Sequence, residues 1–389
     1  MTHMRLISML FSNASTSVIS ILLTFIMARS GGLAALGEFA LAYSAISIAQ
    51  IAVRESCLNV ALARNHDRQI TSQSFTRATI LIGASSILIL TIGAIAQSTI
   101  IAMSAWAVIG FCSFDFLRIW NASNRPRIGN SIVDLLNLSI TGIAALLTEM
   151  SLLSPTGVIA LWSLGLTICS GLLIRRTHVI LAPPKTSLTN RPALILGLQG
   201  LFGAGSVHSA NLAIGGLHGP DIVGALRGAS TFTGPSNILS ATVHSTAISP
   251  LAKTTVRTPQ RRREIQKWLF ASGGLQIPVL AFMTLVAYYW GHILLGDPWE
   301  AVQPLLPWIF IDAFLNALTY PITAAHKADL RVKELLAISV GVGCLRLLAV
   351  PFAALTAGAL GAIVALLAVT ILQFALLCIS YVKYSRNQL

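Results

Sequence analysis

Hydrophobic residues along this chain form long unbroken runs, and short polar connections separate one run from the next. A helix that crosses a bilayer needs about 20 apolar residues. Runs of this length that are rich in Leu, Ile and Ala predict helices and not the strands of a membrane barrel. We therefore expect twelve spans, near residues 6–28, 36–62, 78–97, 99–120, 128–150, 154–175, 193–215, 220–250, 268–290, 302–325, 334–355 and 358–382.

Two places in this pattern predict local breaks. Only Gln97, Ser98 and Thr99 interrupt the apolar run between the third and fourth spans, so the turn there is short. Pro235 follows Gly234 inside the eighth span and predicts a kink near its middle. The first apolar run is longer than the 7–15 residues of a signal peptide, so we expect it to remain as a helix.

Composition agrees with a membrane protein that has no soluble domain. Hydrophobic residues make up 55% of the 389 residues, charged residues make up 10%, and the mean hydropathy is +0.77. A soluble domain has about 25% charged residues. The five cysteines all fall within predicted spans and lack metal-ligand spacing, so we expect neither a disulfide nor a metal site.

The net charge of +13 could indicate nucleic-acid binding, but the placement of the charge argues against it. All but four of the 26 Lys and Arg residues fall at the termini or in the even-numbered connections; the exceptions are Arg29, Arg54, Arg227 and Arg346. This bias follows the positive-inside rule and predicts that both termini are cytoplasmic. Basic loops on that side are expected to contact anionic membrane lipids, and no nucleic-acid partner is expected.

The chain divides into two similar halves. We expect an N-terminal lobe at 1–175, a cytoplasmic linker at 176–192 and a C-terminal lobe at 193–389, each lobe with six spans. "GGLAALGEFALAYSA" from Gly31 resembles "GGLHGPDIVGALRGAS" from Gly215, where three extra residues precede the matching glycine. A second similarity joins "FDFLRIWNASNRPR" to "FIDAFLNALTYPITAAHKADLR". These similarities predict a parallel repeat about an axis along the membrane normal.

Polar side chains repeat at helical spacing within several spans, so they share faces. Four spans have such a face, and Arg346 lies about half-way through the eleventh span. The faces are Asn13, Ser17, Ser20 and Thr24 in the first span; Tyr43, Ser47, Gln50 and Arg54 in the second; Arg227, Ser230, Thr231, Asn237 and His244 in the eighth; and Asp312, Asn316, Thr319 and Thr323 in the tenth.

Arginine in the middle of a span costs about 2.5–3.5 kcal/mol on insertion scales, so each such residue needs a reason. We expect Arg227 and Arg346 to line a water-filled cavity. The alternative for Arg227 is an ion pair with Asp312, and Arg54 could instead extend to the interface or pair with a neighbouring helix. The Ser and Thr stripes could equally serve interhelical hydrogen bonding.

Sequence motifs for catalysis are absent. The chain has no G-x-x-x-x-G-K-[ST] loop, no H-E-x-x-H and no G-x-S-x-G. We therefore expect no enzyme activity and no cofactor.

The segments "MARSGGLAALGEFALAYSA", "GALRGASTFTGPSNIL…ISPLAK" and "NALTYPITAAHKADLR" resemble the multidrug/oligosaccharidyl-lipid/polysaccharide (MOP) exporter superfamily, and within it the bacterial polysaccharide-unit flippases. The resemblance implies an all-α integral membrane fold in which about twelve transmembrane helices form two six-helix lobes around a central cavity. It further implies that Arg54 and Arg227 face that cavity. Drug and cation antiporters of the superfamily usually carry acidic residues in the first helices, and this first span has none.

Our leading hypothesis is a flippase in the bacterial inner membrane that moves an undecaprenyl-diphosphate-linked oligosaccharide to the outer leaflet for polysaccharide export. Its partners would be the glycosyltransferases and the polymerase that make and use the glycolipid. A cation-coupled exporter of small amphiphilic molecules, a non-transporting scaffold and an integral-membrane glycosyltransferase are the alternatives. The predicted substrate-binding residues are Arg54, Arg227, Arg346, Tyr43, Gln50, Asn237, His244, Asp312 and Asn316.

Overall fold

A computed structural model describes residues 2–59, 68–124, 128–177, 191–252, 258–328 and 332–387. All regular elements in these ranges are helices, which confirms the predicted all-α fold. They are α1 (Thr2–Val53), η1 (Arg54–Leu58), α3 (Arg68–Ile95), α4 (Thr99–Asn124), α5 (Ile128–Glu149), α6 (Pro155–Thr177), α7 (Arg191–Gly200), η2 (Leu201–Gly205), α8 (Ser206–His218), α9 (Pro220–Thr231), α10 (Gly234–Ala252), α11 (Pro259–Leu295), α12 (Trp299–Val302), η3 (Gln303–Leu305), α13 (Leu306–Ala328) and α14 (Val332–Asn387).

Nine helical runs of the described residues are long and apolar enough to cross a membrane. Two of them, Asn13–Leu58 and Lys333–Lys383, each hold two spans that meet at a sharp kink. The pair α9 and α10 supplies one more span, so the structure agrees with about twelve. The predicted kink of the eighth span is confirmed, because the helix breaks at Phe232 and Thr233, directly before Gly234 and Pro235.

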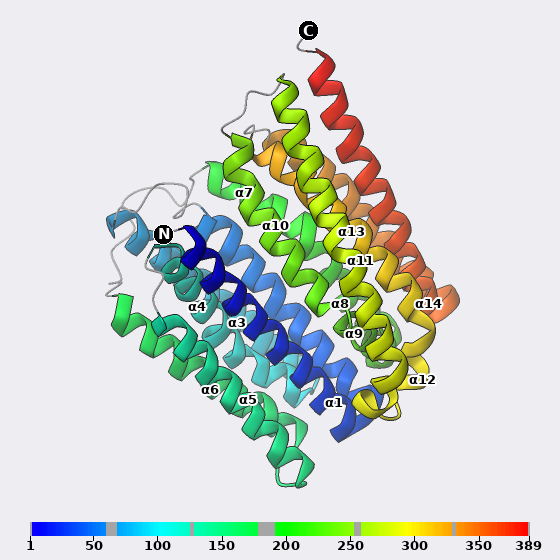
Figure 1. Cartoon of the computed structure of the whole chain (residues 1–389). Helices are drawn as coiled ribbons and strands as arrows, with labels where there is room; N and C mark the ends of the chain where they lie inside the picture. The colour runs from blue at the N-terminus through cyan, green and yellow to red at the C-terminus, as the bar shows by residue number, and fades with distance from the viewer. Residues whose placement is uncertain are drawn as a thin grey trace.

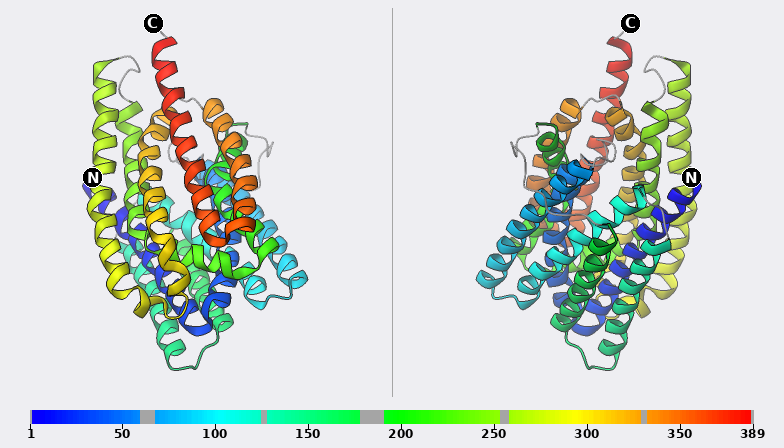
Figure 2. Two further views of the ribbon diagram at one scale, coloured as in Figure 1. Left: turned by 90° about the vertical axis from the view of Figure 1, so that its right-hand side faces the viewer. Right: turned by 90° about the vertical axis from the view of Figure 1, so that its left-hand side faces the viewer.

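The first lobe contains α1 and α3 to α6, and the second contains α7 to α14. The two lobes lie side by side with their helices roughly parallel, the first in blue to teal and the second in green to red (Figures 1 and 2). Both termini lie at the same end of the bundle, which we call the terminal end. The opposite end carries the tight connections between paired spans, and we call it the turn end.

Each connection at the turn end contains one residue with positive φ. Six described residues have positive φ, and one falls in each of the six turns. Four of the six are glycines, which adopt this conformation without a Cβ clash. The residues are Gly32, Gln97, Ser151, Gly219, Gly296 and Gly358, and Gln97 confirms the predicted short turn between the third and fourth spans.

At the turn end the two lobes are in direct contact. The ring of Phe25 in α1 lies 6.3 Å from that of Phe232, which follows α9, and Phe232 lies 6.1 Å from Trp299. Leu41 of α1 fills the space that a Cβ on Gly215 of α8 would need. The seam between the lobes is therefore closed at this end by apolar packing.

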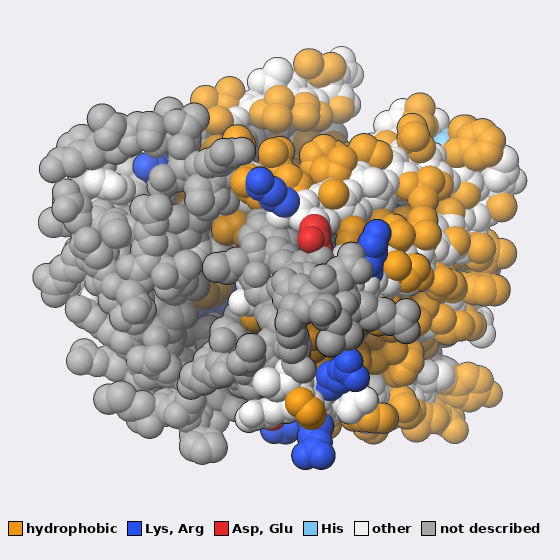
Figure 3. All heavy atoms as spheres, turned by 90° about the horizontal axis from the view of Figure 1, so that it is seen from above, with side chains coloured by type: hydrophobic (Ala, Val, Ile, Leu, Met, Phe, Trp, Pro, Cys, Tyr) orange, Lys and Arg blue, Asp and Glu red, His pale blue; other side chains and the backbone are white. Residues whose placement is uncertain are grey.

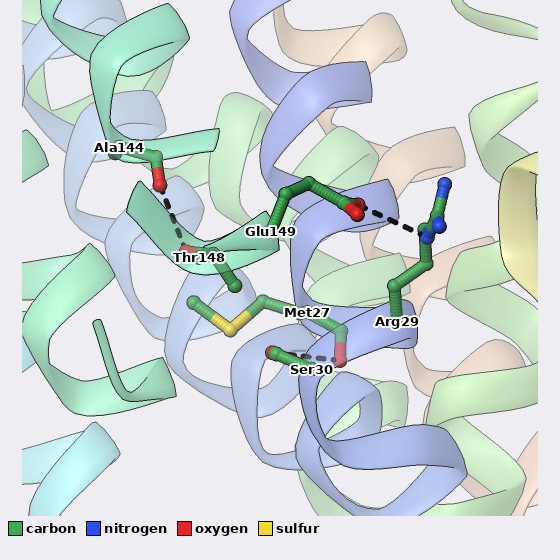
Figure 4. Close-up of polar contacts among 6 residues, drawn as sticks. All are labelled: Met27, Arg29, Ser30, Ala144, Thr148 and Glu149. Carbon is green, nitrogen blue, oxygen red and sulfur yellow. Dashed lines mark hydrogen bonds and ion pairs between the residues drawn. The ribbon is translucent and has the colours of Figure 1, made fainter. Parts of the chain in front are cut away.

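One ion pair at the turn end explains the position of Arg29, a basic residue outside the general charge pattern. Its Nε lies 3.1 Å from a carboxylate oxygen of Glu149 at the end of α5 (Figure 4). Both side chains are about half exposed, 49% and 54%, so the pair contributes at most about 1 kcal/mol. It nevertheless balances the charge of Arg29 locally.

The terminal end is basic. Exposed Lys and Arg side chains gather on this face of the molecule (Figure 3). Arg261 differs from its neighbours Arg262 and Arg263, because it is fully buried and donates hydrogen bonds to the carbonyls of Leu251 and Ala325. It thereby binds the C-terminal ends of α10 and α13, where carbonyl groups lack helical partners.

Candidate functional site

The side chain of Arg227, in α9 of the second lobe, contacts α1 of the first lobe. Its Nη2 donates a hydrogen bond to the Ser20 hydroxyl at 2.5 Å. Its guanidinium carbon lies 4.0 Å from the ring centre of Tyr43 and 5.8 Å from that of Phe39. Ser20, Phe39 and Tyr43 all belong to α1, so one arginine of the second lobe is held by the two spans of the first.

Arg227 has no carboxylate within ion-pair distance among the described residues, since the two ion pairs found there join other residues. The alternative of an Arg227–Asp312 pair is therefore wrong. The aromatic faces offset part of the cost of burying the charge, because a cation over a ring is stabilised by the ring's quadrupole. Nε of Arg227 is buried and has no hydrogen-bond partner in the described part of the chain, so it can still donate to an incoming acceptor.

His208 of α8 is a site residue that the sequence analysis missed. It lies close enough to Arg227 for a direct electrostatic interaction, and its Nδ1 has no partner among the described atoms. A single histidine in an apolar helix gives no periodic signal. Its proximity to Arg227 follows only from the packing of α8 against α9. Arg227, Ser20, Tyr43 and His208 form what we call the turn-side cluster.

Arg54 lies nearer the terminal end, at the start of the π-helix η1. It interacts electrostatically with Asp115 in its own lobe and with His244 and Tyr320 in the other lobe. No ion pair within 4.0 Å involves Arg54 in the described chain. Arg54 therefore has electrostatic partners in both lobes, and among the described residues no carboxylate neutralises its charge by direct contact.

Two other predicted site residues, Gln50 of the same face and His244 of the eighth span, lie near Arg54. Gln50 hydrogen-bonds to Asp115, and His244 Nδ1 lies 3.4 Å from the Tyr320 carbonyl. Together with Arg54 they form what we call the terminal-side cluster. Asn237 belongs to neither cluster: its side chain is exposed and donates to the Thr233 hydroxyl at 3.4 Å.

Arg346 and the acid of the tenth span are placed differently from the prediction. Arg346 is only 3% exposed and lies inside the second lobe, where it donates to Ser206 at 2.9 Å and to Gln373 at 3.1 Å. Asp312 is 7% exposed and accepts a hydrogen bond from Asn316 at 2.9 Å. The structure does not bring these three residues to the clusters between the lobes. Their side chains form hydrogen bonds within the second lobe instead.

The first lobe has a comparable buried acid, Asp115 of α4. Arg118 pairs with it at 2.8 Å and also donates to Thr16 of α1 at 2.5 Å. Each lobe thus encloses an aspartate with an arginine nearby, Arg118 in the first lobe and Arg346 in the second. Within the described residues, no group of three or more His, Cys, Asp or Glu side chains could hold a metal ion.

A small internal pocket lies behind the turn-side cluster, within the first lobe. Ser20 and Tyr43, which hold Arg227, also line this pocket together with Asn137 and Trp162. The Asn137 Oδ1 and the Trp162 Nε1 are both buried without a hydrogen-bond partner among the described residues. The first lobe therefore offers one free acceptor and one free donor just behind the arginine.

No protein-family model and no curated protein matches this sequence significantly. Solved structures match it over nearly its whole length. The lipid II flippase MurJ in an inward closed conformation has a TM-score of 0.70 at 10% identity, covering 98% of this chain and 89% of MurJ. The eukaryotic MATE transporter AtDTX14 has a TM-score of 0.68 at 12% identity, covering 99% and 97%.

A MOP superfamily transporter from Pyrococcus furiosus has a TM-score of 0.62 at 12% identity, covering 97% of this chain and 94% of its own. That transporter is described as having a binding pocket of reverse polarity, which suggests a different function for it. The chain therefore shares the fold of these transporters, which confirms the fold that the sequence resemblance implied.

Proposed function

We propose that this protein is a transporter that moves a lipid-linked oligosaccharide of the undecaprenyl-diphosphate type from the inner to the outer leaflet. The observation that carries the proposal is a pair of arginines, Arg54 and Arg227, between the two lobes. Neither forms an ion pair within 4.0 Å in the described chain, and they lie at different depths. An anionic head group that moves from one leaflet to the other would meet them in turn.

The chemistry of the two clusters fits a diphosphate linked to a sugar. A guanidinium can bind phosphate oxygens through two parallel hydrogen bonds, which a lysine cannot do. Arg54 would make the first contact, and Arg227 would receive the diphosphate near the turn end. His208 and Gln50 would supply hydrogen bonds to phosphate or sugar oxygens.

We further propose a location, an orientation and partners for the protein in the cell. We place the protein in the bacterial inner membrane with the terminal end, where the exposed basic residues gather, in the cytoplasm. Glycosyltransferases would then supply the glycolipid on that side, and a polysaccharide polymerase would use it on the other. Anionic lipids would contact the basic residues of the terminal end.

A second candidate is a cation-coupled exporter of small amphiphilic molecules, which the likeness to MATE transporters favours. Such a transporter needs an acidic group that a cationic substrate can reach. The buried carboxylates Asp115 and Asp312 are each bound by side chains of their own lobe. Glu55 of η1 also reaches the second lobe, where it packs on Gly200, but its carboxylate accepts a hydrogen bond from Asn59. Arg54 and Arg227 have no ion pair among the described residues, so the geometry favours an anionic substrate.

The test is reconstitution into liposomes with a labelled polyprenyl-diphosphate glycolipid. We expect translocation by the wild type, loss of translocation in Arg227→Ala at normal protein level, and partial recovery in Arg227→Lys. Arg29→Ala is the matched control, since Arg29 is half exposed at the turn end. A folded Arg227→Ala with full activity would overturn the proposal. Export of a cationic dye with no movement of the glycolipid would support the second candidate instead.

A further inference from the structure

At the turn end the backbones of α1 and α9 pack directly against each other, with few polar contacts between the two helices. A Cβ on Gly224 would lie 2.6 Å from the Leu33 carbonyl oxygen and 3.0 Å from the Gly37 nitrogen. A Cβ on Gly37 would in turn collide with the backbone of Pro220. Gly37 and Gly224 are the matching glycines of the two sequence repeats, so the repeats meet each other at their equivalent positions.

The polar contacts across this same seam all come from one side chain of α9. Within the described chain, Arg227 makes the polar links between α9 and α1: it donates a hydrogen bond to Ser20, stacks on Tyr43 and Phe39, and interacts with the Tyr43 hydroxyl. Arg227 follows Gly224 by three residues, so both lie on one face of α9. The guanidinium and the glycine contact therefore engage α1 as a unit.

We propose that Arg227, bound to Ser20 and Tyr43, is a latch that keeps the turn end closed, and that a diphosphate group opens it by competing for the guanidinium. The inference rests on the proposed function for the identity of the anion. Ser20 and Tyr43 are then positioning residues, which hold Arg227 in the absence of substrate. They take the place of the phosphate oxygens in the closed state.

The competition has a direct chemical basis. The latch uses a neutral hydroxyl and an aromatic ring, both of which bind a guanidinium more weakly than an anionic oxygen does. A diphosphate offers several such oxygens, and the buried Nε of Arg227 is available to bind one of them. Once the guanidinium turns to the anion, only apolar and backbone packing holds α9 against α1. A ligand that binds the open arrangement better shifts the population towards it.

The latch can be tested by measuring the distance between the lobes at the turn end. Spin labels at Met150→Cys and Glu300→Cys, both exposed, report on the first and the second lobe, in a background that lacks the five native cysteines. Double electron–electron resonance in nanodiscs then gives the fraction of molecules with a long distance. Inorganic pyrophosphate and farnesyl diphosphate are the probes, and sulfate is the control anion.

We expect the wild type to be closed without ligand and to open with either diphosphate. Ser20→Ala and Tyr43→Ala should raise the open population without ligand by on the order of tenfold. Tyr43→Phe, which keeps the ring face, should stay closer to the wild type. Ser30→Ala is the matched control, because the Ser30 hydroxyl bonds to Met27 within α1 and not across the seam (Figure 4). Arg227→Gln should be open without ligand and should not respond to diphosphate.

Several results would overturn the latch. One is a closed turn end in both Ser20→Ala and Tyr43→Ala, and another is opening of Arg227→Gln by diphosphate. A wild type that translocates the glycolipid while Ser20→Ala and Tyr43→Ala both stay closed would refute the latch alone. A Tyr43→Ala that opens while the wild type ignores every diphosphate would support the latch and refute the proposed substrate.

Discussion

Arg346 donates a hydrogen bond from Nη1 to the carbonyl oxygen of Gly203 at 3.2 Å. Gly203 belongs to η2, the π-helical segment in the middle of the seventh span, where the regular ladder of backbone hydrogen bonds is interrupted. Gly343, one turn before Arg346, packs directly on the backbone of Phe202. Arg346 therefore stabilises an irregular helix inside a lobe, and its position in the eleventh span needs no substrate to explain it.

Arg346→Ala should lower the stability of the protein by about 3 kcal/mol, because hydrogen bonds of a charged donor to Gly203, Ser206 and Gln373 are lost in a buried place. Thermal unfolding in detergent, followed by loss of monodisperse protein, measures the change. Arg262→Ala, at an exposed position, is the control. A stable Arg346→Ala that has lost transport would instead return Arg346 to the binding site.

Breaking the Asp115–Arg118 pair should also destabilise the fold. Both side chains are 4% exposed, and removal of one partner from a buried pair typically costs about 3–5 kcal/mol. Arg118→Ala alone should therefore be less stable than Arg118→Ala combined with Asp115→Ala. The double variant should recover only in part, since the hydrogen bond of Arg118 to Thr16 is lost as well. Equal stability of the single and double variants would contradict a direct coupling.

Sequence patterns were sufficient for the spans because each apolar run is long enough to cross a bilayer, and Pro235 marks the kink of the eighth. They also indicated Arg54 and Arg227, since a charge in an apolar helix is conspicuous. The same argument failed for Arg346. Its carbonyl partner is exposed by a π-helix that leaves no signature in the local sequence, and single-sequence periodicity cannot show which neighbour a buried charge has.

Substitutions at the positive-φ residues of the turn end should change the stability of the protein in opposite directions, depending on whether a glycine is introduced or removed. Gln97→Gly and Ser151→Gly should each raise stability by up to about 1 kcal/mol, because a left-handed conformation is strained for a residue with a Cβ. Gly32→Ala should lower stability by about 1–2 kcal/mol for the same reason. Thermal unfolding of these three variants is the measurement. Stabilisation by Gly32→Ala would show that the turn is not left-handed.

The charge pattern predicts the orientation in the membrane. A cysteine at Arg262 should react with an impermeant thiol reagent only from the cytoplasmic side, and a cysteine at Glu300 only from the outside. Both positions are exposed, at opposite ends of the bundle. Labelling of intact cells and of inverted vesicles distinguishes the two sides. Labelling of Arg262→Cys in intact cells would show that the orientation is the opposite of the predicted one.

The membrane potential should influence translocation. A diphosphate carries about two negative charges, and each charge is worth about 2.3 kcal/mol per 100 mV. Outward movement from a negative interior is therefore favourable, and we expect faster translocation in liposomes as an imposed inside-negative potential grows. We expect this translocation to proceed without any nucleotide. A rate that is independent of the potential would indicate that a cation travels with the head group.

The six short turns also determine how the chain can be built into the membrane. Because each pair of spans is joined by only a few residues, with a single left-handed residue at the bend, the pairs can enter the bilayer as helical hairpins. Little hydrophilic chain then has to be carried across during synthesis. On the finished protein, the face opposite the termini exposes almost no loop, so proteases and antibodies would find few segments there to bind.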